Sequence, residues 1–379
     1  MKIIILVRIL WTAGTQKIAI AEATQLANEG HDVELVFLRG SKMWVADELL
    51  KGVKYTVISK DGESFFSPLY GFITHIFAPN RGSESRVDFN LIRKFPKYVR
   101  SKNVDYIICH DQFAGIAGYY CWKKLKIKYS VFLHELLITH DVPILGRLWK
   151  WYELKVLNNA TKIFAVTDAV NRSVAKHVKI KVITNWPGMD VNSNVGFEFK
   201  KDIIIAAAFW DAGRRPNVYL DLLESLSNFT LYFIGNWHTP KLKEDFIQSI
   251  KQKNLSDRIV MKYGIDESEL GRLYDESKFS IRFGFGEGGV GTSTIESIQH
   301  CVPVIVNRDL GISDLIAANN CGLVLSNIDR DAVRDFLSKN NNQVSYQELQ
   351  NRIRDLASSH SWKEHARILV HDISEADYT

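Results

Sequence analysis

The chain has 379 residues, of which 46% are hydrophobic and 24% are charged, and its net charge is +5. A chain of this length is expected to divide into two domains, and the balanced composition excludes disordered and collagen-like proteins. No apolar run reaches the roughly 18 residues of a transmembrane helix, and MKIIILVRIL, interrupted by Arg8, predicts a buried first strand rather than a signal peptide. Four cysteines without metal-ligand spacing indicate reduced core residues of a cytosolic protein: Cys109, Cys121, Cys301 and Cys321.

The charge is distributed unevenly along the chain. Residues 1–190 contain 27 Lys and Arg against 17 Asp and Glu, whereas the remainder contains 21 against 26. A basic first half fits an anionic partner, either a phosphorylated acceptor or an anionic membrane surface. A merely solvated, lysine-rich surface is the alternative reading.

The first half alternates strand-like and helix-like segments. Residues 3–7 predict a strand, residues 16–30 a helix that stops at Gly30, and residues 31–38 a second strand. This βαβ order predicts a parallel sheet. Further strands are expected at 55–59, 104–110, 129–134, 162–167 and about 180–184. The irregular residues 185–201 predict a linker.

The alternation restarts after this linker. Strands are expected at 202–209, 230–236, 258–264, 279–285 and 302–307, and helices at 218–227 and from Lys241 to Asn254. The pattern predicts two doubly wound α/β domains that face each other across a cleft. Ligands of such sheets bind beyond the carboxyl ends of the strands, so the loops that follow strands are the candidate sites.

Two loops of the first half carry candidate binding residues. WTAGTQK places Gly14 at the start of a helix, where free N–H groups can bind an anion, although an ordinary βα turn has the same pattern. His134 and Glu135 end a strand, and a histidine in that position can donate to a sugar hydroxyl or stabilise developing charge. His110 and Asp111 end the preceding strand in the same way and are a second, less favoured pair of candidate binding residues.

WDAGRRPN follows the first strand of the second half. Arg214 and Arg215 precede a helix that begins near Pro216. Two guanidinium groups beside a helix N-terminus suit a diphosphate, because arginine offers fixed bidentate donors. Two solvated arginines in a surface loop are the alternative.

GFGEGGVGTSTIES, residues 284–297, combines five glycines with Glu287 and Glu296. A buried strand is expected to enter this stretch, its glycines to turn the chain, and a helix capped by Thr292 or Ser293 to leave it. Glu296, one turn into that helix, can accept two hydrogen bonds from a ribose diol or simply complement the helix dipole.

Several segments, in their order and spacing, resemble the retaining nucleotide-sugar glycosyltransferases of family 4, which have the GT-B fold. The resemblance covers nearly the whole chain. It is carried by TQKIAIAEATQLANEGHDVELVF, FAVTDAVNRSVAKH, ITNWPGMD, LYFIGNW, LSDRIVMKYGIDESELGRLYDESKFSI, CVPVIVNRDLGISDLI, NNCGLVL and SWKEHARILVHDI. The last segment is similar to a terminal helix that crosses back onto the first domain.

The resemblance implies a GT-B architecture of two Rossmann-like domains. Residues 1–188, with a returning helix at about 361–379, would bind the acceptor, and residues 200–360 would bind the nucleotide-sugar donor. Glu296 would hold the nucleotide ribose, and His134 would lie near the transferred sugar. The catalytic set is completed by Glu287, Arg214 and Arg215, of which the arginines would neutralise the leaving diphosphate. Donor and phosphate contacts would come from Gly14, Gly288, Gly289, Val290, Gly291 and Thr292.

The sequence departs from the family pattern at several positions. The family's two glutamates are separated by seven residues, and counting back from Glu296 puts Gly288 at the first position, so Glu287 lies one residue early. Either the loop is adjusted and Glu287 contacts the sugar, which we favour, or that contact is absent. The glycine pair of the first loop is reduced to Gly14, the glycine before Pro303 is replaced by Cys301, and WDAGRRPN replaces the usual diphosphate-binding pair.

The resulting hypothesis is a retaining hexosyltransferase that uses a UDP-, GDP- or ADP-sugar without a metal or prosthetic group. The acceptor would be a glycan, a lipid-linked saccharide or a polyprenyl phosphate. Residues 91–102 and 122–129, which mix basic and aromatic side chains, predict a cytoplasmic protein with peripheral contact at the inner membrane face. The alternative is a catalytically silent nucleotide-sugar-binding subunit of a glycosylation assembly. An epimerase is a weaker third option, and no nucleic-acid-binding module is present.

Overall fold

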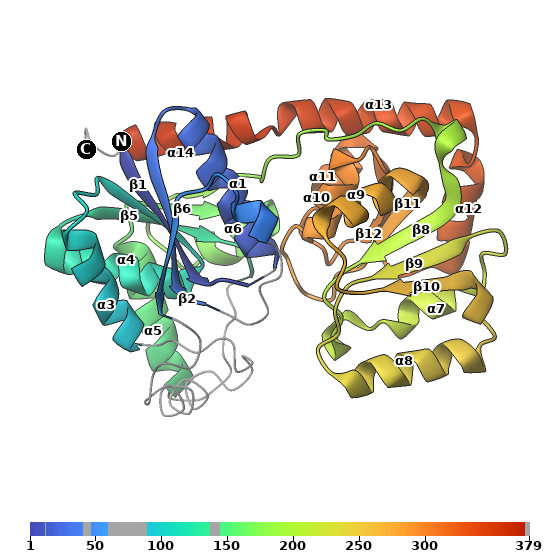
Figure 1. Cartoon of the computed structure of the whole chain (residues 1–379), viewed down its shortest axis with the longest axis horizontal. Helices are drawn as coiled ribbons and strands as arrows, with labels where there is room; N and C mark the ends of the chain where they lie inside the picture. The colour runs from blue at the N-terminus through green and yellow to red at the C-terminus, as the bar shows by residue number, and fades with distance from the viewer. Residues whose placement is uncertain (12, 41–46, 60–88, 137–144, 376–379) are drawn as a thin grey trace. The chain divides into compact units, whose positions relative to one another are not determined.

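The computed structural model describes residues 1–11, 13–40, 47–59, 89–136 and 145–375. The chain forms two compact units (Figure 1). The first unit consists of residues 1–187 and 362–379, and the second of residues 188–361. The chain therefore leaves the first unit once and returns to it with its last helix.

A parallel seven-stranded sheet forms the centre of the first unit. Its strands lie in the order β3 (Tyr55–Ser59), β2 (Asp32–Arg39), β1 (Lys2–Ile9), β4 (Tyr106–His110), β5 (Lys128–Leu133), β6 (Lys162–Ala165) and β7 (Val182–Thr184). Strands β1 to β3 are added toward one edge of the sheet, and strands β4 to β7 are added toward the other edge, as in a doubly wound sheet. Most residues of β1, β2, β4 and β5 are buried, since helices cover both faces of such a sheet.

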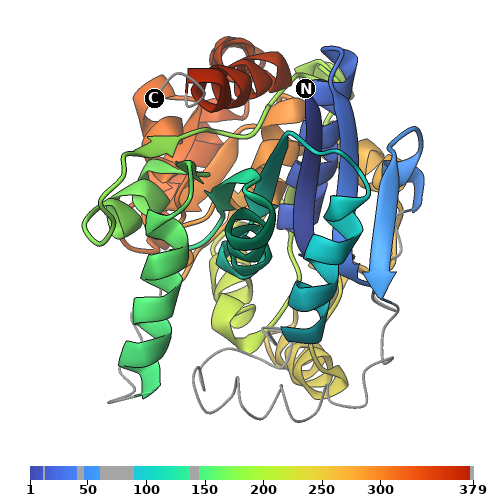
Figure 2. The ribbon, with the colours of Figure 1, turned by 90° about the vertical axis from the view of Figure 1, so that its left-hand side faces the viewer.

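The helices of the first unit are α1 (Gly14–Asn28), η1 (Asp47–Leu50), α3 (Phe89–Arg100), α4 (Gln112–Leu125), α5 (Leu145–Asn158), α6 (Asp168–Ala175) and α14 (Trp362–Glu375). The last helix packs beside α1, where Ala366 and Ile373 join Ala19, Ala23 and Leu26 in one core. On the opposite face α4 packs between α3 and α5 (Figure 2).

A parallel six-stranded sheet forms the centre of the second unit. Its order is β10 (Ile259–Lys262), β9 (Thr230–Ile234), β8 (Lys201–Ala207), β11 (Ser277–Arg282), β12 (Val304–Asn307) and β13 (Gly322–Leu325). Strands β8 to β10 are added toward one edge of this sheet, and strands β11 to β13 are added toward the other edge. The two sheets confirm the predicted pair of doubly wound α/β units.

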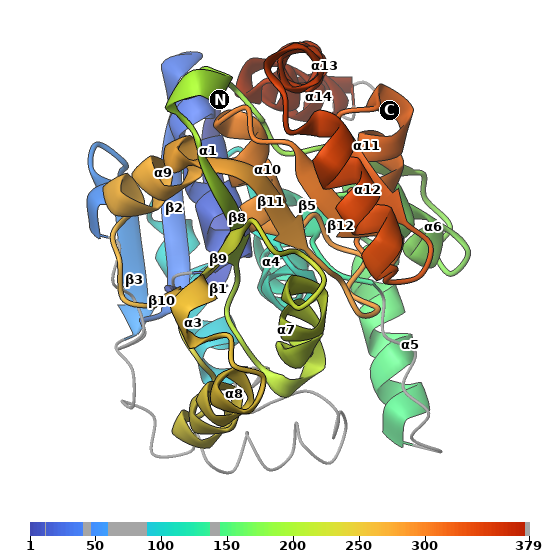
Figure 3. The ribbon, with the colours of Figure 1, turned by 90° about the vertical axis from the view of Figure 1, so that its right-hand side faces the viewer.

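Helices cover both faces of the second sheet, with α7 and α8 on one face and α9, α10 and α11 on the other (Figure 3). Their bounds are α7 (Asn217–Leu223), α8 (Pro240–Gln252), α9 (Glu267–Glu276), α10 (Thr292–Gln299), α11 (Ser313–Asn319), α12 (Arg330–Asn340) and α13 (Gln343–Ser359). Short 3-10 turns lie at η3 (Phe197–Phe199), η4 (Ala212–Arg214) and η5 (Ser256–Arg258).

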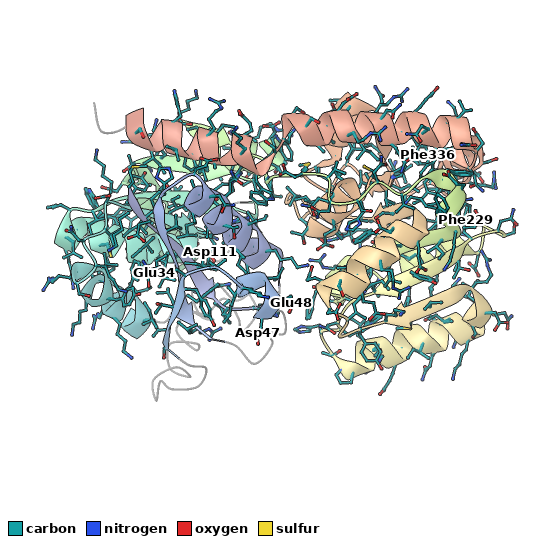
Figure 4. All side chains as sticks on the ribbon, turned by 45° about the horizontal axis from the view of Figure 1, so that its top comes forward. Glu34, Asp47, Glu48, Asp111, Phe229 and Phe336 are labelled. Atoms are coloured by element: carbon teal, nitrogen blue, oxygen red, sulfur yellow. The ribbon has the colours of Figure 1, made fainter. Side chains whose placement is uncertain are left out.

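Aromatic side chains fill much of the second core. The fully buried Trp210 stacks on Phe233 with ring centroids 3.8 Å apart, and its indole N–H donates to the Ile234 carbonyl. Phe279 on β11 packs edge-on against Phe229 and Phe336, which Figure 4 labels. Trp210 immediately precedes the Asp211–Arg215 loop, so this packing anchors the loop at its start.

Most predicted elements differ at their ends from the observed ones by a few residues, and two of them adjoin the glycine and arginine loops. The helix expected at 218–227 ends at Leu223, and the strand expected at 279–285 runs from Ser277 to Arg282. The strand stops early because Gly284 exchanges two hydrogen bonds with the Asn307 side chain, which replaces sheet pairing. The four cysteines are buried and free, as expected from their apolar contexts.

Lys200 is a buried cation that directly precedes β8 in the second unit. It is 6% exposed, and its ammonium group donates to the carbonyls of Tyr274, Asp275 and Ser277. This lysine therefore joins the start of β8 to the junction between α9 and β11. Burial lowers the pKa of Lys200 to about 8, while Asp275 and Cys301 act in the opposite direction.

We predict a pH-dependent stability from Lys200. The lysine binds its proton more weakly in the folded than in the unfolded protein, so its contribution to stability is present above pH 10.5 and is lost as pH falls to about 8. Relative to the Lys200→Met variant, the unfolding free energy of the wild type should rise by roughly 2 kcal/mol between pH 7 and pH 9.5. Urea titrations at both pH values measure this difference, and parallel pH profiles of the two proteins would contradict it.

Candidate functional site

The glycine-rich stretch of the second unit links β11 to α10. Gly286, Gly288 and Gly291 have positive φ values of 76°, 64° and 62°. Gly291 is the N-cap of α10, and no side chain caps the helix. The expectation that Thr292 or Ser293 would cap it is therefore wrong, because both residues already lie inside or at the start of the helix. The first backbone N–H groups of α10 are left for other partners.

A second loop fixes the shape of this stretch. The N–H of Gly311 donates to the Gly289 carbonyl over 2.9 Å, and a Cβ atom on Gly311 would lie 1.8 Å from the Gly288 oxygen. No side chain fits at position 311 without displacing the backbone. The loop after β12 therefore presses directly on the glycine loop, and this close approach holds the backbone of residues 288 and 289 in place.

Glu287 joins two arginines. Its Oε2 atom accepts a hydrogen bond from Arg282 Nη2 over 2.6 Å and lies 3.7 Å from Arg214 Nη1. Arg282 is 1% exposed, whereas Arg214 and Glu287 are each 27% exposed. Burial, and then the neighbouring Arg282, lower the pKa of Arg214. The three side chains form a cluster of two cations and one anion, which we call the arginine pair with Glu287.

Arg282 was not among the predicted site residues. It lies at the last position of a strand in which every residue is buried, and a fully charged residue in that position is a signal that sequence reasoning missed. A buried guanidinium needs an anionic partner, and the nearest carboxylate in sequence is Glu287. Tyr219 contacts the residue that follows Arg282, because its hydroxyl accepts a hydrogen bond from the Phe283 N–H over 3.0 Å.

Arg215 differs from its neighbour Arg214. Its backbone is left-handed, with φ 45°, and its guanidinium lies over the Phe285 ring at 4.6 Å. Asp211 shapes this loop, because its carboxylate accepts a hydrogen bond from the Arg214 N–H over 2.9 Å. The structure thus brings Arg214 to Glu287 and directs Arg215 onto an aromatic ring of the glycine loop.

Glu296 lies in the second turn of α10 beside Tyr274 of α9. The Tyr274 hydroxyl donates to Glu296 Oε2 over 3.2 Å and also approaches the Ser293 carbonyl at 3.2 Å. Burial raises the pKa of Tyr274 well above its usual range, so the tyrosine stays a donor. His300 stacks on Tyr274, and its Nδ1 atom lies 2.8 Å from Asp275 Oδ1. Tyr274 therefore fixes the orientation of the Glu296 carboxylate.

His134 belongs to the first unit and follows β5 directly. Its Nε2 atom lies 2.9 Å from Nδ1 of His110, whose Nε2 atom lies 3.3 Å from Glu22 Oε1. His365 of α14 contacts the other oxygen of Glu22 over 2.9 Å. His110 and Glu22 are fully buried, and His134 is partly exposed. Burial, and then His110, lower the pKa of His134 well below its usual range.

The remaining predicted residues lie at loop starts. Gly14 begins α1, with Ala13 as an N-cap that forms no side-chain hydrogen bond, and the helix is held to β1 by Gln16, which donates to the Ile9 carbonyl. Thr12 of the first loop and residues 137–143 of the loop after His134 lie outside the described residues. Within the described part of the chain no group of three or more His, Cys, Asp or Glu is arranged to hold a metal ion.

Sequence and structure comparisons give a consistent assignment. The model of Glycosyltransferase Family 4 matches residues 12–191. No curated protein sequence matches the chain significantly.

Solved structures of similar fold extend over nearly the whole chain. Anabaena HepE in complex with UDP and glucose has a TM-score of 0.77 at 13% identity, and the match covers 99% of this chain and 100% of HepE. Sucrose-phosphate synthase of Thermosynechococcus elongatus has a TM-score of 0.73 at 12% identity, with 99% of each chain covered. A mutant of S. aureus TarM, in complex with fondaparinux, alpha-GlcNAc-glycerol and UDP, has a TM-score of 0.69 at 12% identity, with 98% of this chain and 99% of TarM covered.

These neighbours share the two parallel α/β units described above, so they show that the fold is GT-B. The family match lies in the part of the chain that forms the first sheet and its helices. Together the two findings show a chain with the GT-B fold whose residues 12–191 match the model of Glycosyltransferase Family 4.

Proposed function

We propose that the chain is a retaining hexosyltransferase that moves a sugar from a nucleotide-sugar donor, bound by the second unit, to a glycan or lipid-linked acceptor, bound by the first. The observation that carries the proposal is the arginine pair with Glu287, beside a glycine loop that leads into a helix N-terminus. This combination suits a diphosphate, because both the cations and the N–H groups favour negative charge.

In this proposal Arg214 and Arg282 neutralise the diphosphate as it leaves. Glu287 cancels one of their two charges in the free enzyme and holds both guanidinium groups in place. Since negative charge develops on the leaving group in the transition state, prearranged cations lower the barrier without reorganisation. Glu287 then acts on the diphosphate through the arginines, which differs from the direct sugar contact that the sequence pattern favours. Arg215 would stack beside the donor from its position over Phe285.

Glu296 is proposed to accept hydrogen bonds from the ribose hydroxyls. Its orientation is supported by Tyr274, which remains protonated and donates to one carboxylate oxygen. The backbone of Gly288, Gly289 and Val290 would approach the donor sugar, and the N–H groups of Gly291 and Thr292 would face the phosphates. HepE and TarM structures contain UDP, which supports a uridine nucleotide as the first donor base to test.

His134 and Gly14 are the residues of the first unit that we place near the sugar and its acceptor. His134 stays neutral, because its burial disfavours the charged form. A neutral imidazole suits hydrogen bonding to a sugar hydroxyl better than ion pairing. Attack from the face of the leaving group, with retention at the anomeric carbon, needs only such positioning groups and a stabilised diphosphate.

The helical face formed by α3, α4 and α5 supports a membrane-bound acceptor. Exposed cations on it include Arg93, Lys94, Lys97, Arg100, Lys123, Lys124 and Lys126. Three of the lysines of α4 and its C-cap lie over aromatic rings of the same segment. On α5, Leu148 and Trp151 are 54% and 58% exposed. Cations with exposed apolar side chains are the composition of surfaces that bind anionic lipid headgroups. Among the described residues, no helix combines the length and the apolar character required to cross a bilayer.

We predict that the chain transfers sugar from a UDP-sugar, and that Arg282→Leu and Glu296→Gln both weaken UDP binding. Losing a charge-assisted contact of about 1.5–3 kcal/mol should raise Kd roughly 10- to 100-fold. Arg282→Leu should also lower kcat roughly 100-fold or more, because its cation acts on developing charge. Isothermal titration with UDP and a transfer assay with radiolabelled UDP-glucose measure both effects.

The matched controls for this experiment are Arg334→Leu and Glu348→Gln, whose side chains are 51% and 62% exposed on α12 and α13. They should bind UDP like the wild type. Unchanged UDP binding in Arg282→Leu and Glu296→Gln would refute the proposed donor site. Tight UDP binding by the wild type without transfer to any acceptor would instead favour the silent binding subunit.

We also predict that the first unit binds vesicles containing anionic phosphatidylglycerol. Replacing Lys94, Lys97 and Lys123 with glutamate should weaken binding roughly 100-fold or more at low salt, since each surface cation contributes about 1 kcal/mol. The control replaces Lys241, Lys251 and Lys339 of the second unit with glutamate, which changes the net charge equally. Equal loss of binding in both variants, measured by vesicle sedimentation, would contradict a specific surface on α3 and α4.

A further inference from the structure

Four buried or half-buried side chains of the first unit form one continuous row. The row runs from His134 through His110 and Glu22 to His365, and it ends at the carbonyl of Trp186, which lies 2.8 Å from His365 Nδ1. Its members come from the end of β5, the end of β4, α1 and α14. Phe132 stacks against His110 and His134, so the rings are held in fixed planes.

The carbonyl at one end of the row determines where the protons lie. A carbonyl only accepts, so His365 Nδ1 must carry a proton. The contact between His365 Nε2 and Glu22 Oε2 requires a further proton, held by one atom or the other. Both oxygens of Glu22 face imidazole nitrogens, and its pKa is lowered to about 2 although burial raises it. With Glu22 as the carboxylate, this proton lies on His365 Nε2, so both nitrogens of His365 act as donors.

His110 is the neutral link in the row. Its Nε2 atom faces the other carboxylate oxygen of Glu22, which only accepts, so this nitrogen carries a proton. The charge of Glu22 is already balanced by His365, and a second buried cation would have no anion. His110 Nδ1 is therefore a bare acceptor, and His134 must donate to it from Nε2. That arrangement leaves Nδ1 of His134 unprotonated.

We propose that Glu22, His110 and His365 act as positioning residues that hold His134 in the Nε2–H tautomer, so that His134 Nδ1 accepts a hydrogen bond from a hydroxyl of the bound sugar. The sugar contact rests on the proposed transferase function, whereas the tautomer does not. Among the described residues, His134 Nδ1 has no hydrogen-bond partner within the protein. The last helix, α14, thereby determines the chemistry of a residue at the carboxyl end of β5.

No other described group competes for the row. The titratable groups that bear on His134 are His110, Glu22 and His365. Asp111, adjacent to His110 and labelled in Figure 4, uses its carboxylate to cap α4 at the N–H groups of Phe113 and Ala114, and it lies 3.7 Å from Arg8 Nε. Asn185 donates to the backbone carbonyl of His365, which fixes the helix rather than the ring.

Nitrogen NMR of the full chain labelled with ¹⁵N-histidine tests the tautomers without any substrate. At pH 7.5, His134 and His110 should each carry a proton on Nε2 alone, and His365 should carry protons on both nitrogens. An Nδ1–H form of His134, or a mixture of the two tautomers, would overturn the proposal. The measurement is independent of the donor and of transfer, so its failure is distinguishable from failure of the proposed function.

His365→Phe gives the decisive variant. It keeps a ring of similar size but removes the proton donor beside Glu22 Oε2. The proton that neutralises or balances the Glu22 carboxylate must then lie on Glu22 itself or on His110. Every arrangement that leaves no buried donor unpaired then puts a proton on His110 Nδ1, which forces His134 to the Nδ1–H tautomer. A donor replaces the acceptor that faces the sugar, and kcat/KM should fall roughly tenfold or more, as for the loss of one hydrogen bond.

Glu22→Gln is the conservative partner of this variant. Its amide can donate to His365 Nε2 and accept from His110 Nε2, so His134 should keep the Nε2–H tautomer and kcat/KM should stay within about twofold of the wild type. His365 should then lose its second proton. His371→Phe, on the exposed side of α14, controls for an added phenyl ring. Loss of activity in Glu22→Gln with a wild-type circular dichroism spectrum, or an unchanged His134 tautomer in His365→Phe, would refute the positioning role.

Discussion

Parallel pairing of the strands is the constraint on which the rest of the structure depends. Parallel strands cannot be joined by short hairpins, so most of them are followed by a crossover helix that packs on one face of the sheet. All carboxyl ends of a sheet consequently meet at one edge. In the second unit this edge collects Arg282 from β11, Arg214 from the loop after β8 and the glycine loop itself. In the first unit it collects His110 and His134.

In each unit one carboxylate near this edge has two partners. Glu287 serves two arginines in the second unit, and Glu22 serves two histidines in the first. Sharing is required because an isolated buried charge is far more costly than a paired one. It also defines geometry, since a carboxylate with two partners has little freedom to rotate. Both proposed sites thus rely on an anion that orients the groups expected to contact the substrate.

The sequence pattern predicted the strands, the two sheets and the position of the glycine loop because these depend on local apolar runs and on short-range glycine spacing. Lys2–Ile9 and Tyr55–Ser59, for example, are visible as apolar or β-branched runs. Contacts between distant segments were not predictable. Glu22 and His365 are separated by 343 residues, and nothing near Glu22 indicates a partner in the last helix. Arg282 was overlooked because a charged residue at the end of a buried strand has no periodicity, and the caps at Thr292 and Ser293 failed because the glycine at 291 already turns the chain.

The return of α14 to the first unit has a consequence for synthesis on the ribosome. When residues 1–187 have emerged, all seven strands of the first sheet are available, yet the Glu22 carboxyl group still lacks its hydrogen-bond partner His365. The whole second unit must be translated before Glu22 gains that partner. Until then the first unit holds a buried acid with only part of its final environment, and its completion depends on the last helix reaching it. The first unit is thus translated before the second, but its hydrogen bonds are complete only after the last helix has been made.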